Sequence, residues 1–597
     1  MSYQDVITPA QAATLHGLFL ERVKRTPERI AYRYYSHNEW RSYTWRDMRQ
    51  EVARWQVALA SLNLQPGDRV ALMLRNCPEW VMFDQAAMGL GLVVVPLYTV
   101  DRPDNIAYII NDADVKVLLF ETAEQWNGLR TVRDHLPGVV RFISLRNLPD
   151  HGEPRLQSAL EFLPETAQLQ SCRTCKSSKL ATIIYTSGTT GRAKGVMLSH
   201  ANLLTNAHAT LDTFMVNDQD LFLSFLPLSH TFERTLGYYL TMMTGTTVAF
   251  ARSVQSLSDD LQHLRPTLLI SVPRVYERIF TAVRNKLEQG SAIKRWLFHL
   301  TVETGWARFE YQQGRGAWHP SFLLWGLLKS LVADKVLQRL GGRLRVAISG
   351  GAALPPEISR VFVGLGLPIL QGYGLTETSP VIAANRPENN QPDTVGHPIR
   401  DVQIRLDAEG VLWTKSACTM LGYWNNPEAT RQMLSEDGWL NTGDIAQIGP
   451  EGHLRITGRK KDIIVMSNGE KIPPLDMEQA LLQDPLFEQV MIVGEGRHYL
   501  VALAVLNPAA WQEFAQEIGV RTDMPEVLTD SRVQGRILRR MARDLRDFPA
   551  YAHVRGILLL QEPWTVENGF LTPTLKLKRN LVIQQHAEQI AKLYERF

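Results

Sequence analysis

The chain of 597 residues lacks most features of secreted and membrane-spanning proteins. It has four cysteines, too few for a disulfide scaffold. No apolar run approaches the roughly 18 residues that a membrane span requires, and the candidate stretch at residues 322–328 is much shorter. The first residues also lack the cationic segment and apolar core of a secretory signal. These absences predict a cytoplasmic protein.

An excess of charge of one sign is also missing. The 64 basic and 61 acidic residues give a net charge of +3, which neither favours nor opposes a nucleic-acid partner. No basic stretch is interleaved with aromatic residues as in proteins that bind single strands, so we predict no nucleic-acid partner. The hydrophobic content of 45% and charged content of 21% are ordinary for a globular protein.

Two of the few cysteines, Cys172 and Cys175, form a C-x-x-C pair. Two ligands do not complete a zinc site, and no second pair follows nearby. A redox dithiol usually sits at the start of a helix after a strand, whereas this pair lies in a polar stretch. We interpret both as loop cysteines.

Strand and helix patterns alternate along the first half of the chain. Apolar runs near residues 68–74, 93–97 and 115–120 are separated by helical stretches such as 45–63 and 80–90. Strands separated by helices of this length predict a mostly parallel α/β sheet.

The texture changes to short strands and turns near residue 393, and a charged turn follows at 458–462. We therefore predict an α/β protein with a large N-terminal domain, residues 1–459, built mostly of parallel α/β sheets. A β-rich subdomain occupies about 393–459 of it. Residues 460–597 are predicted to form a small, mobile α+β C-terminal domain.

The strongest binding signal is residues 185–195, rich in glycine, hydroxyl side chains and cations. An apolar strand at 180–184 precedes it. Glycines let backbone N–H groups converge on one point, and hydroxyls and cations add to the attraction for phosphate. Because Lys194 is followed by a second apolar run and not by a helix, this is not a Walker loop. It predicts a polyphosphate loop between two strands; the alternative is a glycine-rich hairpin without a ligand. The residues expected at the phosphates are Thr186, Ser187, Gly188, Thr189, Thr190, Gly191 and Lys194.

Two later stretches add to this site. In residues 371–378 an aromatic side chain flanked by glycines, Tyr373, can lie flat against a purine, and Glu377 offers the hard oxygen that Mg²⁺ prefers beside phosphates. Small residues at 349–352 follow a strand, where the carboxyl end of a sheet opens a crevice for ligands. Taken alone, each could be a simple turn.

Residues 185–195 resemble the signature loop of the adenylate-forming superfamily, and the later motifs are similar to its long-chain fatty acyl-CoA synthetase branch. The resemblance covers about residues 15–580. It implies that Tyr373 stacks on adenine, that Thr186 and Thr376 act at the phosphates and that Glu377 binds the metal. The other nucleotide contacts that it implies are Gly350, Gly351, Ala352, Gln371, Gly372, Gly374, Asp444 (ribose) and Arg459.

The resemblance also assigns three residues outside the nucleotide site. His230 borders the pocket for the acyl carboxylate, Lys461 is the pivot between domains, and Lys576 is the catalytic lysine. Leu575 stands where the broad family has a glycine. We choose Lys576 over Lys578 from the Lys-x-x-Arg pattern; the alternative is a solvated basic tail.

The implied reaction is ATP-dependent activation of a long-chain fatty acid to acyl-AMP, followed by transfer to coenzyme A, with Mg²⁺ as the metal. Only 18 residues follow Arg579, too few for a fused carrier domain, so we expect coenzyme A as the acceptor. Rival enzymes are a fatty acyl-AMP ligase and an acyl-carrier-protein synthetase. A silent nucleotide-sensing protein is a different class, against which the retained Lys194, Glu377, Asp444 and Lys576 argue.

Two regions leave alternatives open. Residues 285–340, with four tryptophans, resemble the helical segment of long-chain enzymes and either contact a membrane surface or pack in the core. The basic helix near 532–546 contacts coenzyme A phosphates or an anionic membrane, or is a solvated face. Peripheral association with the inner face of the membrane is therefore an open hypothesis, and the sequence does not predict an oligomeric state.

Overall fold

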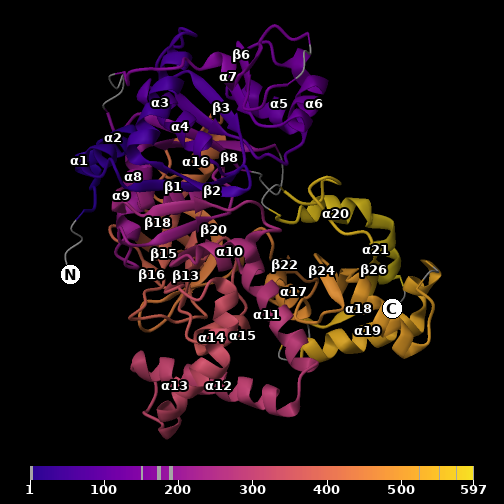
Figure 1. The fold of residues 1–597 in the computed structure, drawn as a ribbon. Coiled ribbons are helices and arrows are strands. Elements are labelled where there is room, and N and C mark those ends of the chain that lie inside the picture. The colour runs from indigo at the N-terminus through magenta and orange to yellow at the C-terminus, as the bar shows by residue number, and fades with distance from the viewer. Residues whose placement is uncertain are drawn as a thin grey trace.

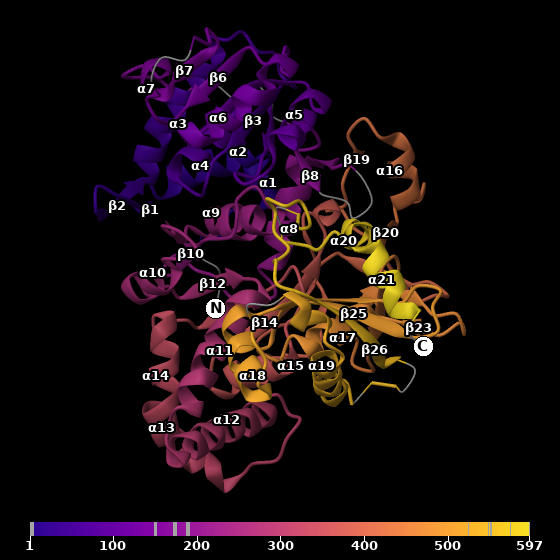
Figure 2. The ribbon, with the colours of Figure 1, turned by 90° about the vertical axis from the view of Figure 1, so that its right-hand side faces the viewer.

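The computed structural model describes residues 5–148, 152–170, 176–186, 192–522, 525–546, 548–549, 552–572 and 575–595. The chain forms two large sheets, a small antiparallel sheet and a C-terminal unit (Figures 1 and 2). The predicted α/β class, with parallel-rich sheets and a smaller C-terminal part, is confirmed.

The first sheet has eight strands in the order β19-β9-β8-β4-β3-β5-β6-β7. Strands from β8 to β7 pair in parallel, whereas β9 and β19 are antiparallel at one edge. The strands are β3 (Arg69–Met73), β4 (Val93–Pro96), β5 (Val115–Phe120), β6 (Arg141–Ser144), β7 (Leu156–Ser158), β8 (Leu180–Thr186), β9 (Lys194–Ser199) and β19 (Gly422–Tyr423). The helices of this part are α3 (Trp45–Ala60), α4 (Pro78–Gly89), α5 (Pro103–Asp112), α6 (Ala123–Val132), α7 (Ala159–Phe162) and α8 (His200–Thr210).

The second sheet has nine strands in the order β16-β15-β14-β13-β12-β10-β11-β1-β2, parallel from β14 to β1. The strands are β1 (Ile30–Ser36), β2 (Glu39–Thr44), β10 (Leu221–Ser224), β11 (Thr247–Phe250), β12 (Leu268–Ser271), β13 (Val346–Ser349), β14 (Ile369–Gly374), β15 (Val381–Ala384) and β16 (His397–Pro398). The helices are α1 (Pro9–Ala12), α2 (Leu15–Arg25), the π-helix η2 (Glu233–Leu240), α9 (Thr241–Thr244), α10 (Leu257–Leu264) and α15 (Pro356–Gly364). One continuous apolar core joins the two sheets and fixes them to each other.

A helical lobe, residues 273–340, is inserted between β12 and β13. It projects at the end of the molecule away from α5 and α6 in both ribbon views (Figures 1 and 2). Its elements are α11 (Pro273–Glu288), α12 (Ala292–Gln312), η3 (Pro320–Leu324), α13 (Trp325–Leu328), η4 (Lys329–Ala333), α14 (Asp334–Leu337) and η5 (Gln338–Leu340). No helix in the described ranges is both long and apolar enough to cross a bilayer.

The β-rich region predicted near residue 393 contains an antiparallel sheet in the order β17-β18-β20-β21. Its elements are β17 (Gln403–Leu406), β18 (Val411–Lys415), α16 (Pro427–Met433), β20 (Leu440–Ile448) and β21 (Leu454–Arg459). The rest of the chain has apolar clusters of its own around the sheet β24-β25-β26. Its elements are β22 (Ile464–Val465), β23 (Lys471–Ile472), α17 (Pro474–Leu481), β24 (Phe487–Val493), β25 (Leu500–Leu506), α18 (Pro508–Ile518), η7 (Pro525–Thr529), α19 (Ser531–Asp544), β26 (Val554–Leu560), α20 (Arg579–Gln585) and α21 (Ala587–Tyr594).

Candidate active site

The two ends of the predicted phosphate loop lie side by side. β8 and β9 pair antiparallel, with Thr186 opposite Lys194, so the strand–loop–strand arrangement is confirmed. Ser199 then caps α8 by accepting the backbone N–H of Asn202 at 3.1 Å. Five expected phosphate contacts, Ser187, Gly188, Thr189, Thr190 and Gly191, lie outside the described residues.

Gly195 allows the close approach behind this loop. A Cβ atom there would lie 2.7 Å from Ile183 Cγ2 and 3.0 Å from the ring of Tyr185. The Tyr185 hydroxyl donates to Asp112 at 2.5 Å, so this tyrosine anchors the base of the loop to α5. Gly195 is therefore required by packing as well as by the loop.

A buried tyrosine that the sequence analysis did not single out joins the phosphate loop to the expected metal ligand. Tyr423, in β19, donates its hydroxyl to Glu377 Oε1 at 2.7 Å. The Lys194 ammonium lies over the same ring, 5.2 Å from its centroid. Glu377 itself sits in the short 3₁₀ turn η6 (Thr376–Thr378), directly after β14. Tyr423 thus lies between Glu377 and Lys194, and their roles at the phosphates and the metal stay predictions.

The expected ribose and adenine residues meet through one carboxylate. Tyr373 donates its hydroxyl to Asp444 Oδ2 at 2.5 Å, and Arg459 Nε donates to Asp444 Oδ1 at 2.7 Å. Asp444 and Arg459 are paired across β20 and β21. Each carboxylate oxygen retains a lone pair, which leaves Asp444 able to accept from a sugar hydroxyl.

The two glycines that flank Tyr373 have different roles. A Cβ atom on Gly374 would lie 1.8 Å from the carbonyl oxygen of Pro380, which is backbone and cannot move aside. On Gly372 the nearest atom would be the carbonyl oxygen of Ala383, at an ordinary 3.5 Å. Only Gly374 is therefore demanded by the local packing.

The strand ends of the second sheet place the expected adenine turn. Gly350 N donates to the carbonyl oxygen of Ser271 at 3.1 Å, and Gly351 has a φ of +81°, the left-handed region that favours glycine. A Cβ atom on Gly350 would lie 2.8 Å from the ring of Phe232. Gly351 and Ala352 are exposed next to this contact. The turn is thus backed by an aromatic ring.

Gln371 has a structural use that the sequence did not reveal. Its Oε1 accepts the backbone N–H of Leu354 at 2.9 Å, and its Nε2 donates to the carbonyl oxygen of Pro392. The buried amide therefore ties β14 to the turn that begins α15.

His230 stands on a loop fastened to the first sheet. Its Nδ1 accepts the backbone N–H of Phe232 at 3.2 Å, and its neighbour Ser229 donates to the carbonyl oxygen of Leu97 at 2.8 Å. Burial, and then the charge of Lys576, lower the pKa of His230 to about 4. His230 is therefore neutral near pH 7, beside the lysine that comes from the tail.

Lys576 enters this cleft from a tight turn. Thr572 N donates to the carbonyl oxygen of Lys576 at 2.9 Å, and Lys576 N donates to the Thr572 hydroxyl at 3.0 Å. Leu575 has a φ of +61°, an uncommon conformation for leucine, at the position where the broad family has glycine. The turn is closed by a bridge between Leu571 and Leu577.

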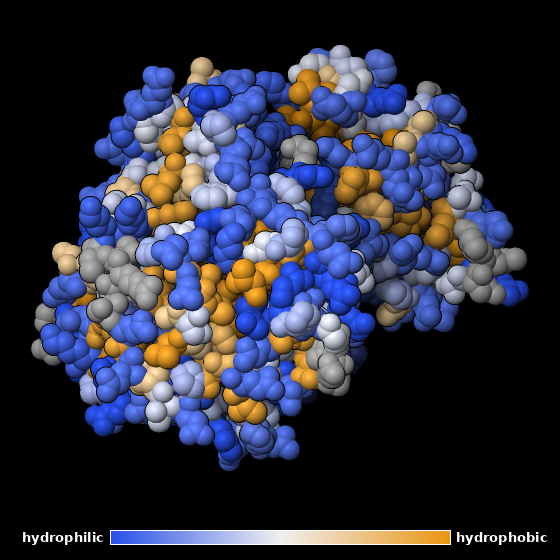
Figure 3. Space-filling view, turned by 90° about the horizontal axis from the view of Figure 1, so that it is seen from above, coloured by the Kyte–Doolittle hydropathy of each residue, from blue (hydrophilic) through white to orange (hydrophobic). Residues whose placement is uncertain are grey.

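Several charged residues of the cleft affect the pKa of Lys576. Its side chain reaches solvent, yet the walls of the cleft are close enough to lower its pKa, first by desolvation and then through the charge of Arg459. Asp444 and Glu377 act in the opposite direction. Lys576, Asp444 and Glu377 therefore lie near enough for their charges to interact. Seen from above, this face of the molecule is hollowed near its middle (Figure 3).

Lys461 lies between β21 and β22, directly beyond the small antiparallel sheet. The turn is held by Asp462 N and Ile463 N, which donate to the carbonyl oxygen of Arg459 at 3.0 and 3.2 Å. Lys461 is exposed, and no hydrogen bond or ion pair among the described residues joins it to the residues of the cleft. Its position fits a pivot and not a ligand.

The donor set fits Mg²⁺ shared with phosphates. Among the described residues no cluster of three His, Cys, Asp or Glu side chains could hold a metal by itself. Mg²⁺ commonly uses one or two carboxylates and fills its other positions with phosphate oxygens and water. Glu377 keeps Oε2 free of Tyr423, so it can act as that single carboxylate.

A second group that the sequence analysis missed is the buried pair Arg234–Asp84. Arg234 also donates to Thr182 Oγ1 at 2.8 Å and to the Tyr239 hydroxyl at 2.9 Å. Thr182 lies in β8, so this network fixes η2 to the strand that leads into the phosphate loop. No local sequence pattern predicts this network, because Arg234 and Asp84 are about 150 residues apart in the chain.

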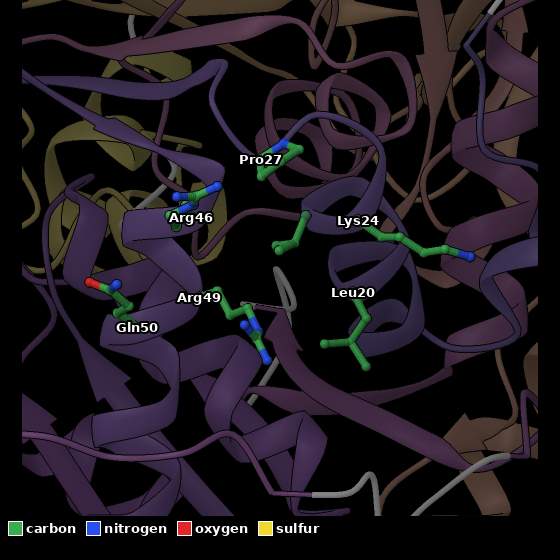
Figure 4. Close-up of a pocket in the computed structure, with 7 residues that line it drawn as sticks. Leu20, Lys24, Pro27, Arg46, Arg49 and Gln50 are labelled. Carbon is green, nitrogen blue, oxygen red and sulfur yellow. The ribbon is translucent and has the colours of Figure 1, made fainter.

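The cavity shown in Figure 4 is separate from this cleft. It has a volume of about 530 Å³ and lies between α2 and α3. Its lining residues are Leu20, Val23, Lys24, Pro27, Arg46, Arg49 and Gln50. None of them was predicted for the nucleotide or acyl site.

Comparison with known proteins identifies the class. Residues 19–424 match the model of the AMP-binding enzyme family, and residues 461–597 match the AMP-binding enzyme C-terminal domain. The chain belongs to the AMP-binding enzyme family.

Among curated relatives, the peroxisomal long chain acyl-CoA synthetase 6 of Arabidopsis thaliana is 32% identical, with 89% of this chain and 78% of that protein covered. A long-chain-fatty-acid–CoA ligase of Mycobacterium bovis is 29% identical over 97% of both chains. Among solved structures, the adenylation domain of a carboxylate reductase from Mycobacterium chelonae matches with a TM-score of 0.75 at 21% identity, covering 99% of this chain and 94% of that one. The last likeness concerns the fold alone.

Proposed function

We propose that the protein is a long-chain fatty acid–CoA ligase that uses ATP and Mg²⁺ and passes through an acyl-AMP intermediate. The observation that carries this proposal is that the charges of Asp444 and Glu377 act on the Lys576 ammonium and oppose the lowering of its pKa. The relatives from Mycobacterium bovis and Arabidopsis thaliana are a long-chain-fatty-acid–CoA ligase and a long chain acyl-CoA synthetase, which supports the choice of acid and thiol.

In the first step a carboxylate oxygen of the fatty acid forms a bond to the α-phosphorus of ATP. The bond from that phosphorus to the bridging oxygen breaks, and pyrophosphate leaves with the electron pair. No general base is needed, because the acid is already ionised. A neutral His230 is suited to border the acyl carboxylate without adding charge.

Negative charge grows at the α-phosphate during this step, and the chain supplies cations there. Lys576 and Lys194 would face the phosphates, with Thr186 and Thr376 as hydrogen-bond donors. Asp444 and Arg459 would hold the ribose side and Tyr373 the base. The metal bound at Glu377 would neutralise phosphate charge.

In the second step the thiol sulfur of coenzyme A bonds to the acyl carbon and loses its proton to solvent, and AMP leaves with the electrons of the broken C–O bond. We propose that residues 460–597 turn about Lys461 between the steps, withdrawing Lys576 and admitting the thiol. The separate apolar clusters of this part support a boundary near residue 459.

Pyrophosphate release, measured with and without coenzyme A across acids from acetate to stearate, tests the proposal. We expect release with the longer acids and matching consumption of the free thiol. Release without thiol consumption would indicate an acyl-AMP or acyl-carrier-protein ligase. No release with any acid would indicate a nucleotide-sensing protein.

A further inference from the structure

The helical lobe carries an unusual concentration of exposed apolar side chains. Of the twenty large hydrophobic residues exposed in the described part of the chain, eight lie between Ile293 and Leu331. Leu323, Leu327 and Trp318 have 79%, 60% and 54% of their surface exposed. The remaining members are Ile293, Trp296, Tyr311, Leu324 and Leu331. Exposure concentrated in one lobe marks an interaction surface more often than a scattered single leucine does.

Packing explains why these side chains face outward. α12 lies tightly against α15, since a Cβ atom on Gly305 would come within 1.8 Å of the carbonyl oxygen of Gly364. A Cβ atom on Gly366 would lie 3.4 Å from the ring of Trp325, and Leu328 is buried. One side of α13 and η4 therefore already fills the core of the lobe.

The other side of the same helical stretch is apolar as well. Leu324, Leu327 and Leu331 follow one another at spacings of three and four residues, which places them on one face. A helix that is apolar all round is normally covered on every side. The face formed by Trp318, Leu323, Leu324, Leu327 and Leu331, here called the leucine face, is thus uncovered in the single chain.

Charge indicates what covers it. Residues 273–340 contain eleven Lys and Arg and five Asp and Glu, a net charge of +6, against +3 for the whole chain. The rest of the chain therefore carries −3. Lys294, Lys335 and Arg339 are exposed, and no ion pair involving them occurs among the described residues. Leucine and tryptophan among unpaired cations form the composition that binds anionic lipid.

A second copy of the chain fits this surface less well. A two-fold interface would bring two lobes of net charge +6 against each other, and like charges so placed repel. An anionic bilayer supplies both opposite charge and an apolar phase for the leucines.

We propose that the leucine face of the helical lobe docks the enzyme on an anionic lipid surface. The inference rests on the proposed function only in the choice of a lipid phase as partner, because the proposed acids partition into it. The leucines would enter the boundary between headgroups and acyl chains, and the cations would meet lipid phosphates.

The test is co-sedimentation of the full chain with vesicles of phosphatidylcholine alone or mixed with phosphatidylglycerol, without ATP. The parent should bind the mixed vesicles about tenfold more tightly than the neutral ones. The double variant Leu323→Glu/Leu327→Glu should lose at least about tenfold in binding, because two exposed anchors are removed. Lys294→Glu/Lys335→Glu should weaken binding to the mixed vesicles only.

Leu160→Glu is the matched control, since Leu160 is 80% exposed on α7, outside the lobe. It should bind as the parent does. All positions changed are exposed, so each variant should fold, and pyrophosphate release with octanoate should be unaffected. This separates the inference from the proposed function, because an inactive protein can still bind vesicles.

Equal binding of the Leu323→Glu/Leu327→Glu variant and the parent would overturn the inference. So would a parent that binds neither vesicle. Light scattering at matched concentrations tests the alternative that a second copy of the chain occupies this face. A parent dimer that becomes monomeric in this variant would assign the face to a second copy.

Discussion

The two sides of the candidate cleft are built differently. On the side of the sheets, the packing leaves no room for added side chains: one on Gly374 would collide with the carbonyl oxygen of Pro380, and one on Gly195 with the side chain of Ile183. Asp444 is fixed from two directions by Tyr373 and Arg459. Such a surface is suited to bind the same nucleotide in each step.

The opposite side is a single turn. Lys576 is held by a few bonds within residues 571–577, and its neighbour Leu575 keeps a strained backbone while 66% exposed. Arg579 then ties the tail to α17 through Glu478, within its own unit, at 2.7 Å. The nucleotide residues thus lie on the side of the sheets, and Lys576 lies on the part that we propose to move. This difference predicts that substitutions on the two sides of the cleft have different effects.

The largest effect is expected for Lys576→Ala. Removing the ammonium should slow pyrophosphate release by about 100- to 1,000-fold, the usual loss when one group that stabilises transition-state charge is removed. Conversion of supplied acyl-AMP and coenzyme A to the thioester should stay within a few-fold of the parent, because Lys576 is withdrawn in that step. The two half-reactions are measured separately by pyrophosphate release and thiol consumption.

Lys578→Ala is the control, since it removes a charge two residues away on the same tail. We expect less than about a tenfold change in either half-reaction. The assignment to Lys576 fails if Lys578→Ala causes the loss and Lys576→Ala does not. Equal loss of both half-reactions in Lys576→Ala would remove the distinction between the two sides of the cleft.

Substitutions on the rigid side, the side of the sheets, should lower the free energy of unfolding. Gly374→Ala places a methyl group against the fixed carbonyl of Pro380, and we expect a loss of about 3 kcal/mol in the free energy of unfolding. Gly372→Ala is the matched control on the other side of Tyr373, where we expect less than about 1 kcal/mol. Urea unfolding of both variants measures the difference. Equal losses would mean that the strand, and not the contact, sets the cost.

The sequence predicted the local parts of this site well. The two strands around the phosphate loop follow from the apolar runs on either side of the glycine-rich stretch. Resemblance supplied Asp444 and Lys576, which spacing alone does not connect. The structure brings them to one cleft, and their roles stay predictions.

The contacts that hold the site together were not predictable from the sequence. Tyr423 reaches Glu377, and Arg234 reaches Asp84, only because strands and helices distant in the chain are packed together. Long-range pairs leave no periodic signal in a single sequence. The exposure of the leucine face could not be decided either, because the same apolar spacing suits a buried helix.

Two buried histidines on the rigid side should make its stability depend on pH. Burial lowers the pKa of His16 and of His200 to about 4, from 6.5 in the unfolded chain. The unfolded state therefore binds more protons below pH 6.5, and stability is complete above that pH and falls toward pH 4. For each histidine, the free energy of unfolding should fall by up to about 2 kcal/mol between pH 6.5 and pH 5.

Urea unfolding at a series of pH values measures this slope. His200 accepts the N–H of Leu15 through Nδ1, and His200→Gln keeps an acceptor but cannot titrate. The free energy of unfolding of this variant should change less steeply with pH than that of the parent. The difference in slope should correspond to at most one bound proton. An unchanged slope would mean that other groups on the rigid side titrate instead.

The smallest effect concerns the bond between Tyr423 and Glu377. Tyr423→Phe removes the hydroxyl that orients the proposed metal carboxylate, and outer partners of metal ligands commonly affect metal affinity by ten- to hundredfold. Because Mg²⁺ would be shared with phosphates here, we expect the Mg²⁺ concentration for half-maximal pyrophosphate release to rise by about tenfold. Tyr499→Phe is the control, since it removes a hydroxyl that donates to the carbonyl oxygen of Leu593 in the C-terminal unit. If both variants keep the parental Mg²⁺ dependence, the rigid side positions the metal without Tyr423, and Glu377 is held by its turn alone.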